Sequence, residues 1–199
     1  MGGIMDMITQ QMGAGMMQQM AEKIGGNNDA VKRAAAVAVP MILAALKRNA
    51  SSRQGAETLA RSLDKNHSDG GILGNLGSLF GGSSIQNGGK ILGHVFGNKQ
   101  GNMTQQLGKA TGIGSKGAGD LMSILAPMVM GALGKSKQQG NIGVSGLQDL
   151  LTQEHQTIQR RQPKQLGMIE GLLDSDGDGD VDMTDILKAG SGLLSGFFK

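Results

Sequence analysis

The chain has 199 residues, with 19 Lys and Arg against 16 Asp and Glu, and it contains no cysteine, tryptophan or tyrosine. This length accommodates one domain or two small ones, and the lack of cysteine excludes disulfides, thiolate metal sites and a cysteine nucleophile. The four Phe residues are the only aromatic ones, which argues against a surface that stacks the bases of single-stranded nucleic acid.

The first predicted element is a methionine-rich helix over residues 4–24. Gly13 and Gly15 weaken this helix by about 1 kcal/mol each relative to alanine. We consider two roles for it, closing the core or binding a partner, since methionine suits surfaces that re-pack. Its apolar stripe follows helical spacing and consists of Met5, Ile8, Met12, Met16 and Met20.

An internal duplication organises most of the chain. Pro40 in VAVPMILAALKRN and Pro127 in ILAPMVMGALGKS are 87 residues apart. We predict two copies of a unit of roughly 50 residues, each with a short helix, a glycine turn, a long apolar helix and a third helix. Each proline predicts a kink or a helix start. The other matched pairs are Met20 and Leu107, Gly25 and Gly112, Val37 and Ile124, Leu46 and Leu133, Leu59 and Leu147, and Leu63 and Leu151.

The longest uncharged apolar runs, 34–46 and 121–133, are each 13 residues long. A membrane-spanning helix needs about 20 apolar residues, so we predict buried core helices and no transmembrane segment. MGGIMDMITQ lacks the positive region of a secretory signal peptide. The compartment stays open between the bacterial cytoplasm and export without a recognisable signal peptide.

Residues 68–102, between the two units, hold 11 of the 35 glycines. Gly89, Gly93 and Gly97 recur every four residues, and small residues at this spacing let helices approach closely. We therefore predict two short, tightly packed helices here. Their apolar stripes are Ile72, Leu73, Leu76, Leu79 and Phe80, and then Ile91, Leu92, Val95 and Phe96.

A family resemblance rests on residues 88–136. The segment GGKILGHVFG, the pair Gln105 and Gln106, and the run LMSILAPMVMGALG resemble the bacterial YidB-like family of uncharacterised proteins. The resemblance covers roughly residues 70–155, and more faintly 15–67 through the duplication. It implies an all-helical fold with a homeodomain-like arrangement of helices, and it implies no known chemistry.

The segment DSDGDGDVDMTD, residues 174–185, is the one constellation with a defined chemistry. It matches the EF-hand calcium loop D-x-[DN]-x-[DN]-G, with Gly179 at the sharp turn. Asp180 would offer its backbone carbonyl, Asp182 would act through water, and Asp185 stands at position 12, where Glu is usual. Ca²⁺ accepts six to eight oxygen ligands, and the predicted ligands are Asp174, Asp176, Asp178, Asp180, Asp182 and Asp185.

Apolar residues flank this loop and predict a helix-loop-helix module. The aspartate at position 12 resembles dockerin-type and other bacterial EF-hand-like loops. EF-hands usually occur in pairs, but the sequence has one such loop, so its partner is either the loop of another copy or absent. The entering face is Leu166, Ile169, Leu172 and Leu173, and the leaving face is Ile186, Leu187, Leu193 and Leu194.

Charge is unevenly distributed along the sequence, and the sequence contains none of the common catalytic motifs. Residues 1–169 carry 17 basic and 9 acidic side chains, whereas residues 170–199 carry 2 and 7. The basic residues are scattered, as on solvated helix faces, so nucleic acid is not expected as a partner. No HExxH, GxSxG or Walker sequence occurs, and repeat ancestry explains His67 and His155 better than metal ligation. We predict that the protein is not an enzyme.

These observations predict an all-α protein with tandem duplicated three-helix units and a calcium-binding EF-hand-like module. The predicted function is that of a calcium-binding structural or interaction protein with calcium-favoured self-assembly into a homo-oligomer. A nucleic-acid-associated protein and a membrane-active Gly-rich protein are the alternatives. The predicted divisions are 1–67 for the first unit, 68–102 for the connector, 103–158 for the second unit and 159–199 for the calcium module.

Overall fold

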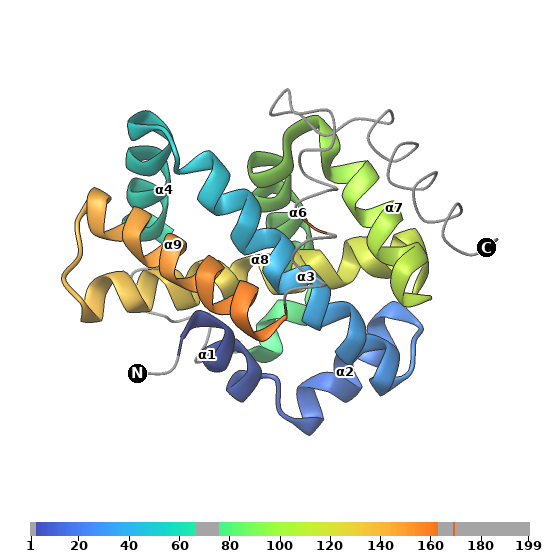
Figure 1. The fold of residues 1–199 in the computed structure, drawn as a ribbon. Helices are drawn as coiled ribbons and strands as arrows, with labels where there is room; N and C mark the ends of the chain where they lie inside the picture. The colour runs from blue at the N-terminus through green and yellow to red at the C-terminus, as the bar shows by residue number, and fades with distance from the viewer. Residues whose placement is uncertain (1–2, 67–75, 163–168, 170–199) are drawn as a thin grey trace. The chain divides into compact units, whose positions relative to one another are not determined.

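The computed structural model describes residues 3–66, 76–162 and 169, and it confirms the all-α class (Figure 1). The chain divides into two compact units, Met1–His155 and Gln156–Lys199, which are described separately. The elements are α1 (Ile4–Gln11), α2 (Ala14–Ile24), α3 (Asn28–Asn49), α4 (Arg53–Asn66), the 3-10 helix η1 (Leu76–Phe80), α6 (Gly82–Phe96), the 3-10 helix η2 (Gly97–Lys99), α7 (Gln100–Thr111), α8 (Gly114–Gln139) and α9 (Val144–Arg161).

Helix α8 forms the centre of the first unit. Every residue from Leu121 to Leu133 is buried, as a helix that is apolar on all sides requires. Helices α1, α2, α3, α4, α6 and α7 all pack against it (Figure 1). By length and composition α8 resembles a membrane span, but 89% of its apolar window is buried inside the protein. The expectation of a buried core helix over 121–133 is therefore confirmed.

Both helix-interior prolines lie inside long helices. Pro40 is buried in α3 and Pro127 in α8, and each helix continues through its proline. Of the two alternatives, a kink or a helix start, the helix start is therefore excluded at both positions. Leu46 and Leu133, which the duplication pairs, expose 3% and 0% of their surface, so their predicted burial is confirmed.

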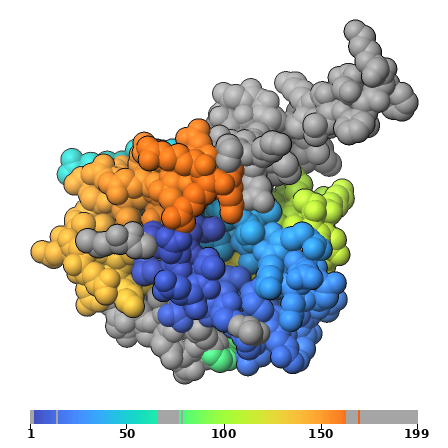
Figure 2. Space-filling model, turned by 60° about the horizontal axis from the view of Figure 1, so that its bottom comes forward, coloured from blue at the N-terminus to red at the C-terminus, as the bar shows by residue number. Residues whose placement is uncertain are grey.

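The methionine-rich segment forms two helices and not the single helix expected from its periodicity. α1 ends at Gln11, and Gly13 takes an extended conformation as the N-cap of α2. Glycine loses more freedom in a helix than any other residue, so a break next to Gly13 costs little. Ile8 and Met20 are 1% and 0% exposed, and both helices pack on α8. Figure 2 shows α1 and α2, dark blue and blue, beside each other on one face. This burial supports the core-closing role.

The glycine-rich connector contributes α6, which packs on α8. The close approach occurs at Gly88, where a Cβ would lie 1.8 Å from the Ser123 carbonyl oxygen. Gly89 would meet only the Ser123 hydroxyl, at 3.9 Å, and Gly97 ends α6 with a φ of +57°. Tight helix packing is therefore present, as predicted. The contact residue is Gly88, however, and not its neighbour Gly89, which the prediction placed on the contact face.

Candidate binding groove

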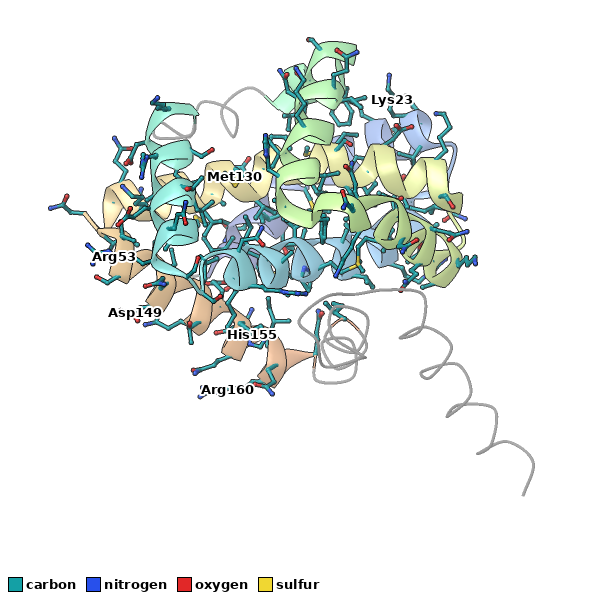
Figure 3. The ribbon with its side chains drawn as sticks, turned by 90° about the horizontal axis from the view of Figure 1, so that it is seen from above. Lys23, Arg53, Met130, Asp149, His155 and Arg160 are labelled. Atoms are coloured by element: carbon teal, nitrogen blue, oxygen red, sulfur yellow. The ribbon has the colours of Figure 1, made fainter. Side chains whose placement is uncertain are left out.

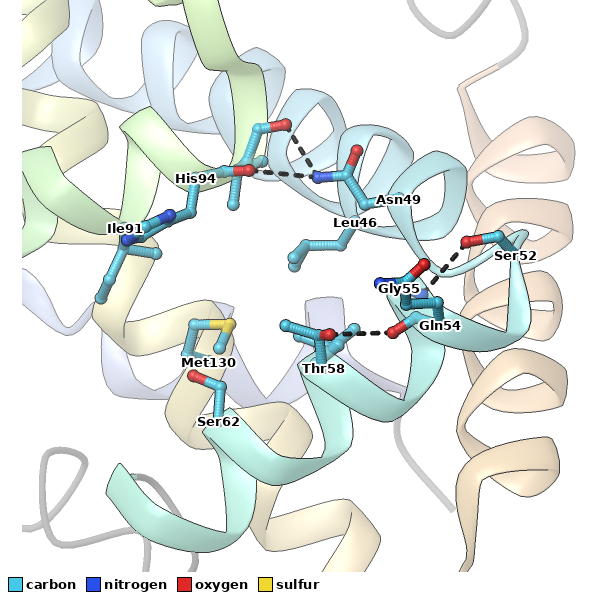
Figure 4. A pocket seen from close by; sticks show the side chains of 12 residues that line it. Leu46, Asn49, Ser52, Gln54, Gly55, Thr58, Ser62, Ile91, His94 and Met130 are labelled. Atoms are coloured by element: carbon cyan, nitrogen blue, oxygen red, sulfur yellow. Dashed lines mark hydrogen bonds between the residues drawn. The ribbon is translucent and has the colours of Figure 1, made fainter.

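A groove of about 600 Å³ opens in the first unit between the end of α3, the first three turns of α4, the last turns of α6 and one residue of α8 (Figure 4). Four helices from three separate stretches of the sequence therefore build it. The lining residues are Leu46, Asn49, Ser52, Gln54, Gly55, Thr58, Leu59, Ser62, Ile91, His94, Val95 and Met130.

The floor of the groove is apolar and one wall is polar. Leu46, Leu59 and Met130 expose 3%, 8% and 4% of their surface, and Met130 reaches the groove from the central helix (Figure 4). The polar wall is one row of α4, because residues four apart share a helix face. This row consists of Gln54, Thr58 and Ser62.

Hydrogen bonds from the end of α3 fix the walls of the groove relative to each other. The Asn49 side-chain amide donates to the carbonyl oxygens of Val95, at 2.9 Å, and His94, at 3.4 Å (Figure 4). These carbonyls belong to the last turn of α6, where helix carbonyls lack partners within the helix. Asn49 therefore joins α3 to α6 through a hydrogen bond between residues that are 46 positions apart in the sequence.

The start of α4 is held close to the end of α3. A Cβ on Gly55 would lie 1.8 Å from the Asn49 carbonyl oxygen, so only glycine fits this contact. The Gly55 amide donates to the Ser52 hydroxyl oxygen at 3.1 Å, which satisfies one of the free amides in the first turn. The Thr58 hydroxyl donates to the Gln54 carbonyl at 2.8 Å. The hydroxyls of Ser52 and Thr58 are therefore both hydrogen-bonded to the backbone of α4.

Cations border the groove, although its lining includes no carboxylate. Arg53 and Arg61, whose side chains are 92% and 71% exposed, share the Glu57 carboxylate at 3.1 and 3.5 Å. Lys90 is exposed and lies one helical turn before His94 on α6. Arg53 points outward in Figure 3. The groove therefore has an apolar floor and a positive border, a combination that suits an apolar segment with acidic neighbours.

An ion pair on the far side of α4 keeps this helix in place. The Lys137 ammonium, on α8, lies 2.6 Å from the Asp64 carboxylate, and the Lys137 side chain is only 16% exposed. The alkyl part of the lysine side chain thus packs against the protein while its charge is neutralised.

Glu154, on α9, is the most buried carboxylate in the described part of the first unit. It is 6% exposed, and its Oε2 atom has no hydrogen-bond partner. Its Oε1 atom would lie 2.6 Å from a Cβ on Gly3, the N-cap of α1. The positive end of a helix dipole stabilises a carboxylate placed in this way, so Glu154 helps to position α1 against the core.

His67 and the six predicted calcium ligands lie outside the described residues. These ligands are Asp174, Asp176, Asp178, Asp180, Asp182 and Asp185. Within residues 3–66, 76–162 and 169, no three His, Asp or Glu side chains are placed to share a metal ion. His94 lines the groove, and His155 is half-buried on α9. The groove itself was not predicted, because no local pattern connects the residues that form it.

Comparison with known proteins shows the family. No curated protein and no solved structure matches the chain. A family model described as a bacterial protein of unknown function (DUF937) matches residues 6–136, from α1 to the last turns of α8. The YidB-like resemblance remains a prediction. Because the match covers well over half of the sequence, the chain belongs to this bacterial family of unknown function.

Proposed function

We propose that the protein is a calcium-binding interaction protein that self-associates, and that it is not an enzyme. The observation that carries this proposal is the acidic segment 174–185, in which aspartates alternate with small or apolar residues at the spacing of an EF-hand loop. Six carboxylates in twelve residues repel one another strongly, and a divalent cation relieves that repulsion.

The described helices support an interaction role. The groove offers apolar surface to a partner, and its border carries more cations than anions, with two arginines on one glutamate. Residues 170–199 carry 7 acidic against 2 basic side chains. Opposite charge on two parts of one chain favours association between copies, and bound Ca²⁺ would reduce the net charge of 170–199 from −5 to −3.

We further propose that α2–α4 and α7–α9 descend from one duplicated unit. Both triplets have the order short helix, long helix with an interior proline, and third helix. Gly25 ends α2 with a φ of +72°, and Gly112 ends α7 with a φ of +77°. Since a left-handed glycine commonly ends a helix, the support comes from its recurrence at the offset of 87 residues.

Calorimetric titration of the full chain with Ca²⁺ tests the calcium proposal. We expect one saturable site per chain, lost in Asp174→Ala and in Asp178→Ala, because each removes a carboxylate ligand. Asp149→Ala is the control, since it removes an exposed carboxylate from α9. Absence of a saturable heat up to tens of millimolar Ca²⁺ would refute the proposal.

Sedimentation velocity with Ca²⁺ and with a chelator tests the self-association. We expect a larger species at micromolar to sub-millimolar protein, more populated with Ca²⁺, because Ca²⁺ lowers the repulsion and orders the flanking helices. A monomer under both conditions would leave calcium as a local structural ion.

A further inference from the structure

We propose that the groove between α3, α4 and α6 binds residues 186–198 of a second copy of the chain. This inference rests on the self-association proposed above and names the two surfaces that make it.

The segment ILKAGSGLLSGFF, residues 186–198, carries its large apolar side chains in three adjacent pairs. The second and third pairs follow the first by seven and eleven residues, which is about two and three helical turns. In a helix these pairs fall on one face, as in partners that bind as a helix in an apolar groove. The pairs are Ile186 with Leu187, Leu193 with Leu194, and Phe197 with Phe198.

The groove matches this face in length. The row of α4 that lines it runs from residue 54 to residue 62, about 12 Å of helix. Two of the apolar pairs in the segment are separated by about 10.5 Å in a helix, so they fit within this length. The apolar floor of Leu46, Leu59 and Met130 would contact them.

Small residues on both sides allow close contact. In a helix Gly190 lies at the centre of the face formed by the apolar pairs, whereas the other small residues of the segment lie at the edge of this face or away from it. The wall contributed by α4 includes Gly55, Thr58 and Ser62. Helices with small residues at their contact approach closely, so the apolar side chains of the segment can reach the floor.

Charge complementarity selects this occupant. The border carries Arg53, Arg61 and Lys90 against the single carboxylate of Glu57. The six aspartates of 174–185 directly precede the segment, and six carboxylates holding one Ca²⁺ remain negative. An acidic loop next to an apolar helix therefore meets a positive border next to an apolar floor.

The groove and the segment are different parts of the chain, so the contact joins two unlike surfaces. Two copies can exchange segments reciprocally in a two-fold dimer, or they can continue as an open chain of subunits. Either arrangement predicts that a copy with a blocked groove can still donate its segment. This property separates the proposal from a symmetric contact through any single surface.

The experiment uses two full-length variants and sedimentation velocity with Ca²⁺ present. Thr58→Trp fills the groove, and the double variant Leu193→Asp, Phe197→Asp removes the apolar face of the segment. We expect each variant alone to be monomeric where the unmodified chain associates. Mixed one to one, they should form a dimer, because one supplies the segment and the other supplies the groove.

Matched controls report on folding and on charge. Thr152→Trp places the same side chain at another exposed helix threonine, whose hydroxyl donates to the carbonyl four residues earlier at 2.9 Å, as that of Thr58 does at 2.8 Å. The double variant Ser191→Asp, Ser195→Asp adds the same charge between the apolar pairs. Both controls should associate like the unmodified chain, and all variants should give the same far-ultraviolet circular dichroism.

The outcomes separate this inference from calcium binding. Calorimetric Ca²⁺ titration of Thr58→Trp should match that of the unmodified chain, since the acidic loop is intact. A saturable heat missing from the unmodified chain would refute the calcium proposal, whereas a heat lost only in Thr58→Trp would show that this variant does more than fill the groove and would count against this inference. Association of Thr58→Trp by itself would overturn the groove as the docking surface. An unmodified chain that stays monomeric, or a mixture of the two variants that does not associate, would overturn the second copy as the occupant.

Discussion

The contact between α6 and α8 allows a sharp test, because two neighbouring glycines differ in what a methyl group would meet. A Cβ on Gly88 would lie 1.8 Å from the carbonyl oxygen of Ser123 and 2.6 Å from its carbonyl carbon. These are backbone atoms of the central helix, which cannot rotate away. For Gly89 the nearest atom is the Ser123 hydroxyl oxygen, at 3.9 Å, which is ordinary contact.

The expected magnitudes follow from this difference. Replacing either glycine by alanine in the middle of α6 gains about 1 kcal/mol of helix propensity. Gly88→Ala also forces α6 away from α8, and overpacking of this kind costs about 1–3 kcal/mol, occasionally more. Because the helix gain is common to both variants, their difference in the free energy of unfolding isolates the cost of the clash. Gly89→Ala should stabilise the protein, and Gly88→Ala should be less stable than Gly89→Ala by about 1–3 kcal/mol.

Thermal melts followed by circular dichroism at the helix band measure this difference. For a chain of this size, each kcal/mol shifts the melting temperature by roughly 2–4 °C. Urea unfolding gives the same difference by an independent route. If Gly88→Ala melts at or above the temperature of Gly89→Ala, the close packing of α6 on α8 at Gly88 is refuted.

Three further predictions concern the core, the repeat and the groove. Leu133→Asp should abolish the cooperative melt, because it buries a charge at a position that is 0% exposed; a melt at an unchanged temperature would contradict this. Gly25→Ala and Gly112→Ala should each cost about 1 kcal/mol in urea unfolding, since both need a left-handed backbone and neither meets an atom within 4 Å; unequal costs would argue against equivalent units. Asn49→Ala should cost about 0.5–1.5 kcal/mol by losing its bonds to the end of α6, and hydrogen exchange at the last turn of α6 should become faster, whereas unchanged exchange would show that Asn49 does not hold the wall.

The helical class and the buried long helices were predictable from local sequence. The run 121–133 is uncharged over nearly four turns, and only burial on all sides suits such a helix. The left-handed glycines at the ends of α2 and α7 were predictable as turns for the same local reason. The acidic loop pattern at 174–185 is likewise complete within twelve residues.

The break between α1 and α2 was only partly visible in the sequence. The apolar stripe of residues 4–24 continues across Gly13 at helical spacing, so periodicity alone favours one helix. The glycines lower the stability of that helix without fixing where it ends. Packing decided the outcome, because α1 and α2 each bury their own apolar residues against α8.

Two features depended on tertiary structure alone. A helix of mixed Gly and apolar residues does not specify its rotation about its own axis, so only packing against Ser123 shows that Gly88 is the contact residue and Gly89 is not. The groove joins Leu46 to Met130 across 84 positions of sequence. Local spacing determines which residues share one helix face, but the way that separate helices meet is set by the packing of the whole core, and the groove exists only where those helices meet.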